Sequence, residues 1–472
     1  MNAPVAEAGK RGVRDGPLFA AKVAVSRAVG AASRATGRGG GTTLPGRVLL
    51  RLAPDAIDRL GRRLTEGSTI VSATNGKTTT AGMIASILAA AGRAPVHNRA
   101  GSNMTWGVAT ALLEQRGAEG LFEVDEAWLP RVASQLEPGL IVLGNLFRDQ
   151  LDRYGELETL ADHWAELVSE RAGRTRFALN ADDPLIADLG RDREERPRPG
   201  VAYFGVEDAS QALPELQHAH DAKHCRRCGH PYTYERAFVG HLGHYSCPNC
   251  GASRPRPDIA AEQIELRGME GSRVSVRTPG GPLDLDLPLP GLYNVYNALA
   301  AIAAALELGV APELIAPALA GMRTAFGRVE TIEIEAKRVS ILLIKNPAGA
   351  NEVLRTLRLE GDAAGLDLWI ALNDRIADGR DVSWIWDADF ELLAGSARRV
   401  VCAGTRAAEM ALRLKYAGLP VEAIEVEPRI EKSLDQSIAA APDRLFALPT
   451  YTALLELRTL LADRGLAQEY WK

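Results

Sequence analysis

Apolar and polar positions along this chain of 472 residues follow two different periods. Short β-branched or apolar runs, typical of buried strands, occur at 69–71, 140–143 and 177–179. Amphipathic segments with helical spacing separate such runs, and the segment 159–170 is one of them. Because strands that alternate with amphipathic helices build parallel sheets covered by helices, residues 42–205 predict a doubly wound α/β fold.

The pattern changes beyond residue 205. Residues 206–258 are rich in Pro, His and Cys, and they interrupt the alternation as an insertion. An Ala-rich helix is predicted from about 295 to 308, and a domain boundary near residue 330 precedes a second α/β set. The strands predicted after the insertion are 272–277, 283–287, 339–344, 366–372, 399–402 and 444–448. We therefore expect two α/β domains, the first of which carries an inserted segment.

The N-terminal segment predicts a helix and not an export signal. The apolar stretch from Leu18 to Ala32 is broken by Lys22, Ser26 and Arg27, which is helix patterning. Its apolar positions favour packing on the first domain, with a weak contact to a membrane surface as the alternative. These positions are Phe19, Val23, Val25 and Val29. Residues 1–41 are therefore predicted to be a flexible N-terminus with a leading helix.

Composition excludes several classes of function. A hydrophobic content of 46% with 24% charged residues is ordinary for a globular protein, and the length suits two to four domains. The net charge of -5 gives no electrostatic argument for binding nucleic acid. No run approaches 18 consecutive apolar residues, so we predict no transmembrane segment and a cytoplasmic protein.

A Gly-Lys-Thr turn between the first predicted strand and the helix after it carries the most specific chemistry. The run Thr69–Val71 enters the turn Asn75-Gly76, and a helical pattern closed by Gly92 follows. Backbone N–H groups and the helix dipole would hold an anion, Lys77 would neutralise it, and a Thr hydroxyl would reach Mg²⁺. A chance Gly-Lys-Thr in a loop is the alternative. The residues predicted to bind nucleotide here are Thr74, Asn75, Gly76, Lys77, Thr78 and Thr79.

Four of the five cysteines form two pairs with two-residue spacing, eighteen residues apart. Each pair places two thiolates on one tight turn, and two such turns predict a closed tetrahedral Zn²⁺ site with a structural role. Disulfides are the less favoured alternative, and nearby histidines such as His241 and His244 are further candidate ligands. The predicted zinc ligands are Cys225, Cys228, Cys247 and Cys250.

The loop T-N-G-K-T-T-T resembles the phosphate loop of the Mur ligases and folylpolyglutamate synthases. The segments 180–184, 291–301 and 326–330 occur in the order of a Mur-ligase central domain. The segment 145–155 is similar to the ligases' N-x-x-x-D-H-L-D stretch, but Gln150 replaces their metal-ligating His. That substitution puts chemistry with a second metal in doubt and indicates a divergent branch. The cysteines and two C-terminal segments, 343–349 and 373–387, resemble the MurT subunits of bacterial lipid II isoglutaminyl synthases.

This resemblance implies roles for residues outside the phosphate loop. Asn294 and Asn297 would hydrogen-bond adenine, although such a pair is often only a helix cap. Arg328 would bind the nucleotide phosphates or ribose. Glu123 and Glu126 compete for the Mg²⁺ role, with Glu126 slightly favoured because it is closer to the exposed end of its strand. A solvated acidic turn is the alternative.

The resemblance also implies a reaction and a partner. ATP would phosphorylate the α-carboxylate of D-glutamate in the lipid II stem peptide, and ammonia would then give D-isoglutamine. Cys402 is predicted to be a buried core residue, so glutamine hydrolysis would need a second polypeptide, the GatD amidotransferase. Asp374 or Asp378 would orient the partner's catalytic His, and Trp384 and Trp386 would anchor the interface. Helix caps and core tryptophans are the alternatives.

The expected organisation is then a central ATP-binding domain over 42–330, with the zinc ribbon at about 206–258. A C-terminal domain over 331–472 would dock the partner. The residues expected to take part in catalysis are Lys77, Glu126, Asp374 and Asp378. Two other functions remain open at this point: an amino-acid ligase of the folylpolyglutamate type and a zinc-ribbon ATPase that binds nucleic acid.

Overall fold

The computed structural model describes residues 16–35, 43–98, 102–149, 157–192, 194, 196–218, 220–322, 329–360 and 365–466. The chain divides into two units. The first comprises Met1–Ile70 and Ala94–Gly139, and the second comprises Val71–Arg93 and Leu140–Lys472. Strand β1 (Gly67–Ser72) leads from the first unit into the second.

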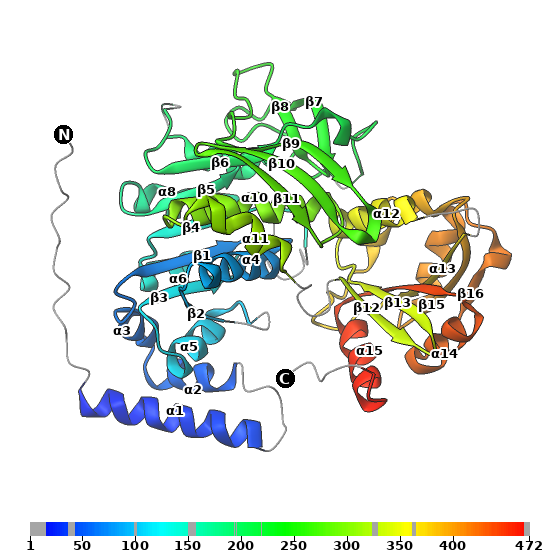
Figure 1. Cartoon of the computed structure of the whole chain (residues 1–472), viewed down its shortest axis with the longest axis horizontal. Coiled ribbons are helices and arrows are strands. Elements are labelled where there is room, and N and C mark those ends of the chain that lie inside the picture. The colour runs from blue at the N-terminus through cyan, green and yellow to red at the C-terminus, as the bar shows by residue number, and fades with distance from the viewer. Residues whose placement is uncertain are drawn as a thin grey trace. The chain divides into compact units, whose positions relative to one another are not determined.

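The first unit is built mainly of helices. Its elements are α1 (Pro17–Ala35), α2 (Leu44–Leu52), α3 (Ala56–Gly61), β2 (Val96–His97), α5 (Thr105–Glu114), β3 (Glu119–Glu123) and α6 (Leu129–Leu136), and β2 pairs with β3 in parallel. The predicted N-terminal helix is confirmed, and it packs on α2 and α5 (Figure 1).

The buried face of α1 differs from the expected one. Phe19 is buried as predicted, but the other buried positions are Ser26, Gly30 and Ser33. A Cβ atom at Gly30 would lie 2.8 Å from the Cγ of Pro45, so the two segments meet too closely for a larger side chain. Val25, which the apolar pattern assigned to the packed face, is 52% exposed.

The second unit begins with the helix after the Gly-Lys-Thr turn and a large mixed sheet. Its helices are α4 (Lys77–Ala90), α8 (Leu157–Arg171), α9 (Pro184–Ala187), α10 (Leu292–Glu307) and α11 (Ile315–Ala320). The strands are β4 (Leu140–Leu143), β5 (Arg176–Asn180), β6 (Val201–Val206), β9 (Ile259–Leu266), β10 (Ser272–Thr278) and β11 (Gly281–Leu287). Strands β4, β5 and β6 pair in parallel, as predicted for residues 42–205, and β9, which was not predicted, also joins in parallel. Strands β10 and β11 extend the sheet in antiparallel fashion. Helix α10 lies beside α4 and against the parallel strands (Figure 1).

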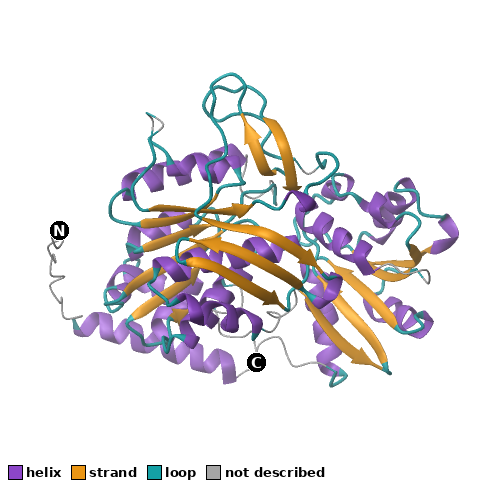
Figure 2. Ribbon diagram, turned by 45° about the horizontal axis from the view of Figure 1, so that its top comes forward, coloured by secondary structure: helices purple, strands orange, loops and turns teal. Residues whose placement is uncertain are grey.

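The insertion separates two strands that are neighbours in this sheet. Phe204 of β6 pairs with Ile259 of β9, so the residues between them leave the sheet and return to it. Within the insertion, β7 (Thr233–Val239) and β8 (Leu242–Ser246) form a separate two-stranded sheet (Figure 2). The predicted ribbon is therefore a distinct substructure.

The C-terminal part of the second unit holds a six-stranded sheet with the order β12-β13-β17-β14-β15-β16. Its strands are β12 (Val329–Ile334), β13 (Lys337–Leu342), β14 (Leu366–Ala371), β15 (Ala397–Ala403), β16 (Ile424–Val426) and β17 (Arg444–Pro449). Its helices are α12 (Pro347–Glu360), α13 (Ala407–Tyr416), α14 (Ile430–Ala440) and α15 (Tyr451–Asp463). All neighbouring strands pair in parallel except β12 and β13.

Alternation along β14 divides this domain into two cores. Leu368 and Ile370 pack with α12 and α13, whereas Trp369 and Ala371 pack with α14 and α15. Side chains on a strand point alternately to its two faces, so a parallel strand covered on both faces is apolar throughout. The second predicted α/β domain is confirmed in this form.

Two adjacent buried carboxylates link the large sheet to the elements around it. Asp182 accepts hydrogen bonds from Arg254 Nε (2.6 Å), the Val206 backbone N–H (2.8 Å) and the Tyr296 hydroxyl (2.6 Å). Asp183 caps α9 and also accepts from the backbone N–H of Leu146 at 2.8 Å. The motif at 180–184 therefore holds α10 and the segment after β4 in place.

No helix in the described part of the chain is both long and apolar enough to cross a membrane.

We predict that Asp182→Ala lowers the free energy of unfolding by about 3–5 kcal/mol, because it removes the acceptor of three buried donors and one of the two carboxylates that pair with the Arg254 guanidinium. Tyr296→Phe removes one of three hydrogen bonds to the same carboxylate and should cost only about 1 kcal/mol. Urea denaturation followed by tryptophan fluorescence measures both changes. Equal stability of Asp182→Ala and the parent chain would contradict this assignment.

Candidate functional site

The Gly-Lys-Thr segment forms the expected strand–turn–helix. Gly76 stands at the N-terminus of α4 with φ +90°, a conformation that glycine adopts at little cost. A Cβ atom on Gly76 would lie 2.0 Å from Oδ1 of Asn297, so the turn also has no room for a side chain. The N-terminus of α4 therefore presents backbone N–H groups and the positive end of its dipole, as an anion site requires.

Lys77 is buried at the first position of α4. Its amine donates to the backbone carbonyls of Ala73 (2.5 Å) and Thr74 (3.3 Å), which belong to the same loop. Thr78 and Thr79 follow on the first helical turn, with Thr78 half-buried and Thr79 buried. The loop thus combines a cation, hydroxyl groups and helix N–H groups in one small region.

Asn294 and Asn297 of α10 form a series of hydrogen bonds that leads to the first turn of α4. Oδ1 of Asn297 accepts from the Thr80 hydroxyl at 3.2 Å, and its amide donates to Asn294 Oδ1 at 3.0 Å. Asn294 in turn donates to the carbonyl of Pro290 at 2.8 Å. These contacts favour a positioning role for both residues. The contact with adenine stays a prediction, and Asn297 also lines a cavity beside the loop.

The segment after β4 fixes the other side of the loop. Asn145 accepts from the backbone N–H of Asn75 at 2.9 Å and donates to the Asn75 carbonyl at 3.0 Å. The backbone N–H of Phe147 donates to the Thr74 hydroxyl at 3.0 Å. Gln150, the substituted position of the family stretch, lies outside the described residues.

The C-terminal domain also reaches the phosphate loop. The amine of Lys345 donates to Asp149 at 2.5 Å and to the Thr74 carbonyl at 3.4 Å. Asn346 and Asn75 exchange two side-chain hydrogen bonds, at 3.0 and 3.3 Å. Lys345 was not among the predicted site residues. The signal for it was the Lys-Asn-Pro sequence directly after a predicted strand.

A cavity of about 90 Å³ opens beside the loop. It is lined by residues of the loop, of α10 and of α12, together with Phe147 and Lys345. Aromatic and aliphatic side chains form most of its wall, and the phosphate loop forms one edge. The lining of this cavity, next to an anion site, suits the nucleoside end of a nucleotide. Its volume lies below the roughly 300 Å³ of a typical ligand pocket, so the cavity would have to widen to admit a nucleoside.

The acidic residues proposed for Mg²⁺ belong to the first unit, whereas Lys77 belongs to the second. Glu123 ends β3 and is buried, with an amide hydrogen bond from Asn103 at 3.5 Å. Glu126 is also buried and lies in the turn before α6. Arg328 falls outside the described residues. The Mg²⁺ role of either glutamate and the nucleotide role of Arg328 therefore stay predictions.

The four predicted zinc ligands converge. Their sulfur atoms all lie within 4.8 Å of one another, with Cys225–Cys250 at 3.6 Å and Cys228–Cys247 at 3.4 Å. Tetrahedral Zn–S bonds of about 2.3 Å place the sulfurs roughly 3.8 Å apart, whereas a disulfide needs about 2.05 Å. The donor set and its spacing fit Zn²⁺ and not disulfides. His241 lies instead against Phe147 and Asp183.

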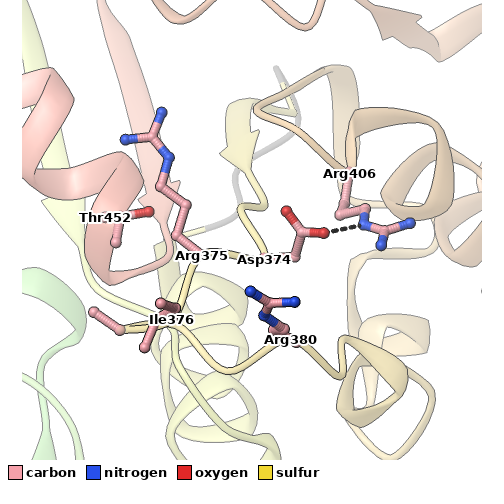
Figure 3. A pocket seen from close by; sticks show the side chains of 7 residues that line it. Asp374, Arg375, Ile376, Arg380, Arg406 and Thr452 are labelled. Atoms are coloured by element: carbon pink, nitrogen blue, oxygen red, sulfur yellow. Dashed lines mark hydrogen bonds and ion pairs between the residues drawn. The ribbon is translucent and has the colours of Figure 1, made fainter.

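The loop after β14 contains both aspartates proposed to act on a partner, and it lines a surface pocket (Figure 3). Asp374 accepts from the Thr405 hydroxyl (2.8 Å) and from Arg406 Nε (2.7 Å). These hydrogen bonds hold the pKa of Asp374 below its ordinary value. Arg375 and Arg380 line the same pocket. Asp374 is therefore an ionised, partly exposed carboxylate.

Asp378 has a different environment. It is buried and accepts from the backbone N–H (2.7 Å) and hydroxyl (2.5 Å) of Thr452, at the N-terminus of α15. Burial raises the pKa of Asp378 above its ordinary value, although the bonds from Thr452 oppose that effect. Asp378 thus tethers the loop to a helix. Asp381, which was not singled out from the sequence, is exposed on the same loop and accepts from the Ser383 backbone N–H.

The two tryptophans of this region differ in how exposed they are. Trp384 is partly buried against the core that contains α12 and α13. Trp386 is 47% exposed and lies 5.9 Å from the ring of Tyr416, which is 68% exposed. Cys402 is fully buried, and burial raises its pKa to about 12, so this thiol is not an activated nucleophile.

The comparisons with known proteins agree with this geometry. The family model "Mur ligase middle domain" matches residues 71–305, and "MurT ligase C-terminal" matches residues 343–454. The chain is 34% identical to the lipid II isoglutaminyl synthase (glutamine-hydrolyzing) subunit MurT of Streptococcus pneumoniae, over 91% of this chain and 94% of that one. The MurT subunit of Staphylococcus aureus strain N315 is 32% identical, over 90% and 93%.

Solved structures share the fold at lower identity. A pseudomurein peptide ligase type C from Methanothermus fervidus aligns with a TM-score of 0.68 and 22% identity, over 86% of this chain and 81% of that one. MurF ligase from Thermotoga maritima in complex with ADP aligns with a TM-score of 0.61 and 14% identity, over 88% and 82%. With two family models matched in order and MurT relatives above 30% identity over nine-tenths of the chain, this protein belongs to the MurT family of Mur ligases.

Proposed function

We propose that this chain is the synthase subunit of a lipid II isoglutaminyl synthase, an ATP-dependent carbon–nitrogen ligase of peptidoglycan synthesis. The α-carboxylate of D-glutamate in the stem peptide attacks the γ-phosphorus of ATP and forms an acyl phosphate, releasing ADP. Ammonia then attacks the acyl carbon, phosphate leaves, and D-isoglutamine results. The relatives' names support this reaction, and they favour it over an amino-acid ligase of the folylpolyglutamate type or a nucleic-acid-binding ATPase.

Two lysines lie at one phosphate loop, and this observation supports the proposal most directly. Lys77 comes from the loop's own helix, and Lys345 comes from the C-terminal domain. Without a nucleotide, each amine donates hydrogen bonds to backbone carbonyls of the loop, and Lys345 also pairs with Asp149. A triphosphate at the N-terminus of α4 would offer stronger, charged acceptors to both amines. The two cations would then stabilise negative charge on the phosphoryl group during transfer.

Mg²⁺ would supply further neutralisation of the triphosphate charge when bound. Thr78 lies on the first turn of α4, in the second unit. We assign its hydroxyl as a ligand of Mg²⁺. Positioning and electrostatics are the protein's main contributions, because phosphoryl transfer needs little covalent help from the enzyme. Zn²⁺ would be structural, since four thiolates complete its shell.

Ammonia would come from a glutamine amidotransferase partner of the GatD type, because the buried Cys402 offers no nucleophile for glutamine hydrolysis. The C-terminal domain is the docking surface in this proposal, with Trp386 and Tyr416 as exposed aromatic contacts. Between the two aspartates, Asp374 suits the task of orienting a partner's catalytic His, because its carboxylate is accessible and ionised. Asp378 would hold the loop in the required conformation.

Replacing either lysine should remove charge stabilisation during phosphoryl transfer. We expect Lys77→Ala and Lys345→Ala each to lower the rate of ATP- and ammonium-dependent amidation of lipid II by about 10²–10³-fold. The measurement is ADP release together with mass analysis of the lipid product. Lys432→Ala, a surface change on α14, is the control and should keep parental activity. Parental turnover by Lys77→Ala would show that the phosphate site is wrongly assigned.

Metal analysis tests the ribbon. Protein purified without added metal should contain about one zinc per chain, and Cys228→Ser should lose that zinc and lower the Tm. Cys402→Ala is the matched control, because this buried cysteine lies outside the cluster, and it should retain full zinc content. Parental stability and activity in a chain shown to be free of metal would contradict a structural role.

Assays with different nitrogen sources test the division of labour. The chain alone should use ammonium but not glutamine, and adding the partner should permit glutamine. Asp374→Asn should reduce glutamine-driven amidation at least tenfold while leaving ammonium-driven amidation unchanged. Asp381→Asn is the exposed-carboxylate control from the same loop and should behave like the parent. If glutamine-driven rates survive Asp374→Asn, the accessible carboxylate does not complete the partner's site.

A further inference from the structure

Glu352 is a buried carboxylate that the proposed reaction has not used. It lies on α12, is 1% exposed, and lines the cavity beside the phosphate loop. Neither of its carboxylate oxygens has a hydrogen bond of ordinary geometry, although the Tyr293 backbone N–H lies close enough to lower its pKa. A buried carboxylate with such weak partners is destabilising, so its presence needs an explanation.

The surrounding protein compensates this charge only weakly. The nearest cation, Arg355, places its Nη1 atom 3.9 Å from Oε1 of Glu352. That guanidinium already donates to the carbonyls of Phe238 (3.1 Å) and Gln211 (2.9 Å). Burial raises the pKa of Glu352 to about 7, against the opposing influence of Arg355 and the Tyr293 backbone N–H. The carboxylate therefore remains able to accept hydrogen bonds from a ligand.

Three other polar side chains that line the cavity have hydrogen-bond partners within the protein. Asn75 is bonded to Asn346, Tyr296 to Asp182, and Lys345 to Asp149. Glu352 differs from these three residues, since neither of its oxygens makes a hydrogen bond of ordinary geometry within the protein. The cavity of about 90 Å³ is several times larger than the ~15 Å³ that a single water needs.

The walls of the cavity indicate the kind of group that enters it. The rings of Phe147, Tyr293 and Tyr296 line it, and Gly76 of the phosphate loop lies at its edge. Flat aromatic surfaces suit a flat aromatic ligand, and the adjacent helix N-terminus suits its phosphates. A purine nucleotide has both parts in one molecule.

We propose that Glu352 is the residue that recognises the base, accepting a hydrogen bond from the exocyclic 6-amino group of adenine. This proposal rests on the nucleotide-dependent function proposed above and names the residue that selects ATP. A purine with hydrogen at position 6 offers no donor there, so Glu352 would stay unpartnered when it binds. Leaving a buried carboxylate unpaired costs free energy, so the purine nucleotide without the amino group should bind more weakly than ATP.

The test compares ATP with purine riboside 5′-triphosphate, which lacks only the 6-amino group. The full-length chain should bind ATP about 10–100-fold more tightly than the analogue, as expected for a hydrogen bond to a charged group. Glu352→Ala should weaken ATP binding by a similar factor and bind both triphosphates equally. Glu352→Gln should keep part of the preference, because an amide oxygen still accepts. Titration calorimetry with Mg²⁺ present measures each Kd.

Matched controls separate recognition from folding. Glu360→Gln changes another carboxylate of α12, one that pairs with Arg444 outside the cavity, and should keep the parental preference. Glu352→Leu replaces the unpaired carboxylate by an apolar group and should have a Tm equal to or above that of the parent. A preference for ATP that persists in Glu352→Ala would overturn the proposal.

Two further outcomes would also overturn it. One is equal binding of ATP and the analogue by the parent chain. The other is a loss in Glu352→Ala that appears with ATP but not with 2′-deoxy-ATP or 3′-deoxy-ATP, which would assign the carboxylate to the ribose. Failure of the proposed function is distinguishable, because then the parent chain would bind no triphosphate and Lys77→Ala would change nothing.

Discussion

The fixed geometry of the phosphate loop is the constraint on which the rest of the site depends. An anion site made of backbone N–H groups works only if the backbone is held in one conformation before the ligand arrives. Gly76 meets Asn297 so closely that no side chain fits between them. Asn145 accepts a hydrogen bond from the backbone N–H of Asn75, and Asn346 of the C-terminal domain donates one to the Asn75 side chain. Asparagine suits this work because one amide group both donates and accepts.

The inserted ribbon also helps to hold the phosphate loop in its conformation. The turn between β7 and β8 places His241 against Asp183, with Nε2 3.4 Å from Oδ2. Asp183 also receives the backbone N–H of Leu146, which directly follows Asn145. A Zn²⁺ ion at the cysteine end of the ribbon would therefore stabilise a hairpin whose tip is packed against the segment that holds the loop. That link would give a structural metal a purpose in the proposed nucleotide-binding domain.

Much of the fold followed from the sequence because it depends on local pattern. Every strand predicted from an apolar run was found within a few residues of its expected place, and the four cysteines meet as their spacing implied. The buried face of α1 was predicted only in part: Phe19 is buried as expected and Val25 is exposed. The close approach at Gly30 requires small side chains there, and an apolar pattern does not reveal such a contact. The antiparallel strands β10 and β11 were predicted as strands, but a short apolar run does not reveal the direction of its pairing.

The candidate site was harder to predict, because its contacts join distant segments. Lys345 reaches a loop some 270 positions earlier in the chain, and Glu352 is unusual only for its burial without a partner. The Lys-Asn-Pro sequence marks Lys345 but does not reveal which loop it reaches, and burial without a close partner leaves no local signal. The aspartates show the same limit: Asp374 and Asp378 look alike in sequence, but one lines a surface pocket and the other caps α15.

In the proposed reaction, ATP activates a carboxylate at this loop before nitrogen is added. Lipid II labelled with ¹⁸O in the D-glutamate α-carboxylate tests it most directly, in a reaction with ATP, Mg²⁺ and ammonium. The account predicts that each turnover transfers one ¹⁸O atom to inorganic phosphate, detected by mass spectrometry, and leaves the other in the amide. Release of phosphate without ¹⁸O while the amide forms, or formation of AMP and pyrophosphate, would contradict it.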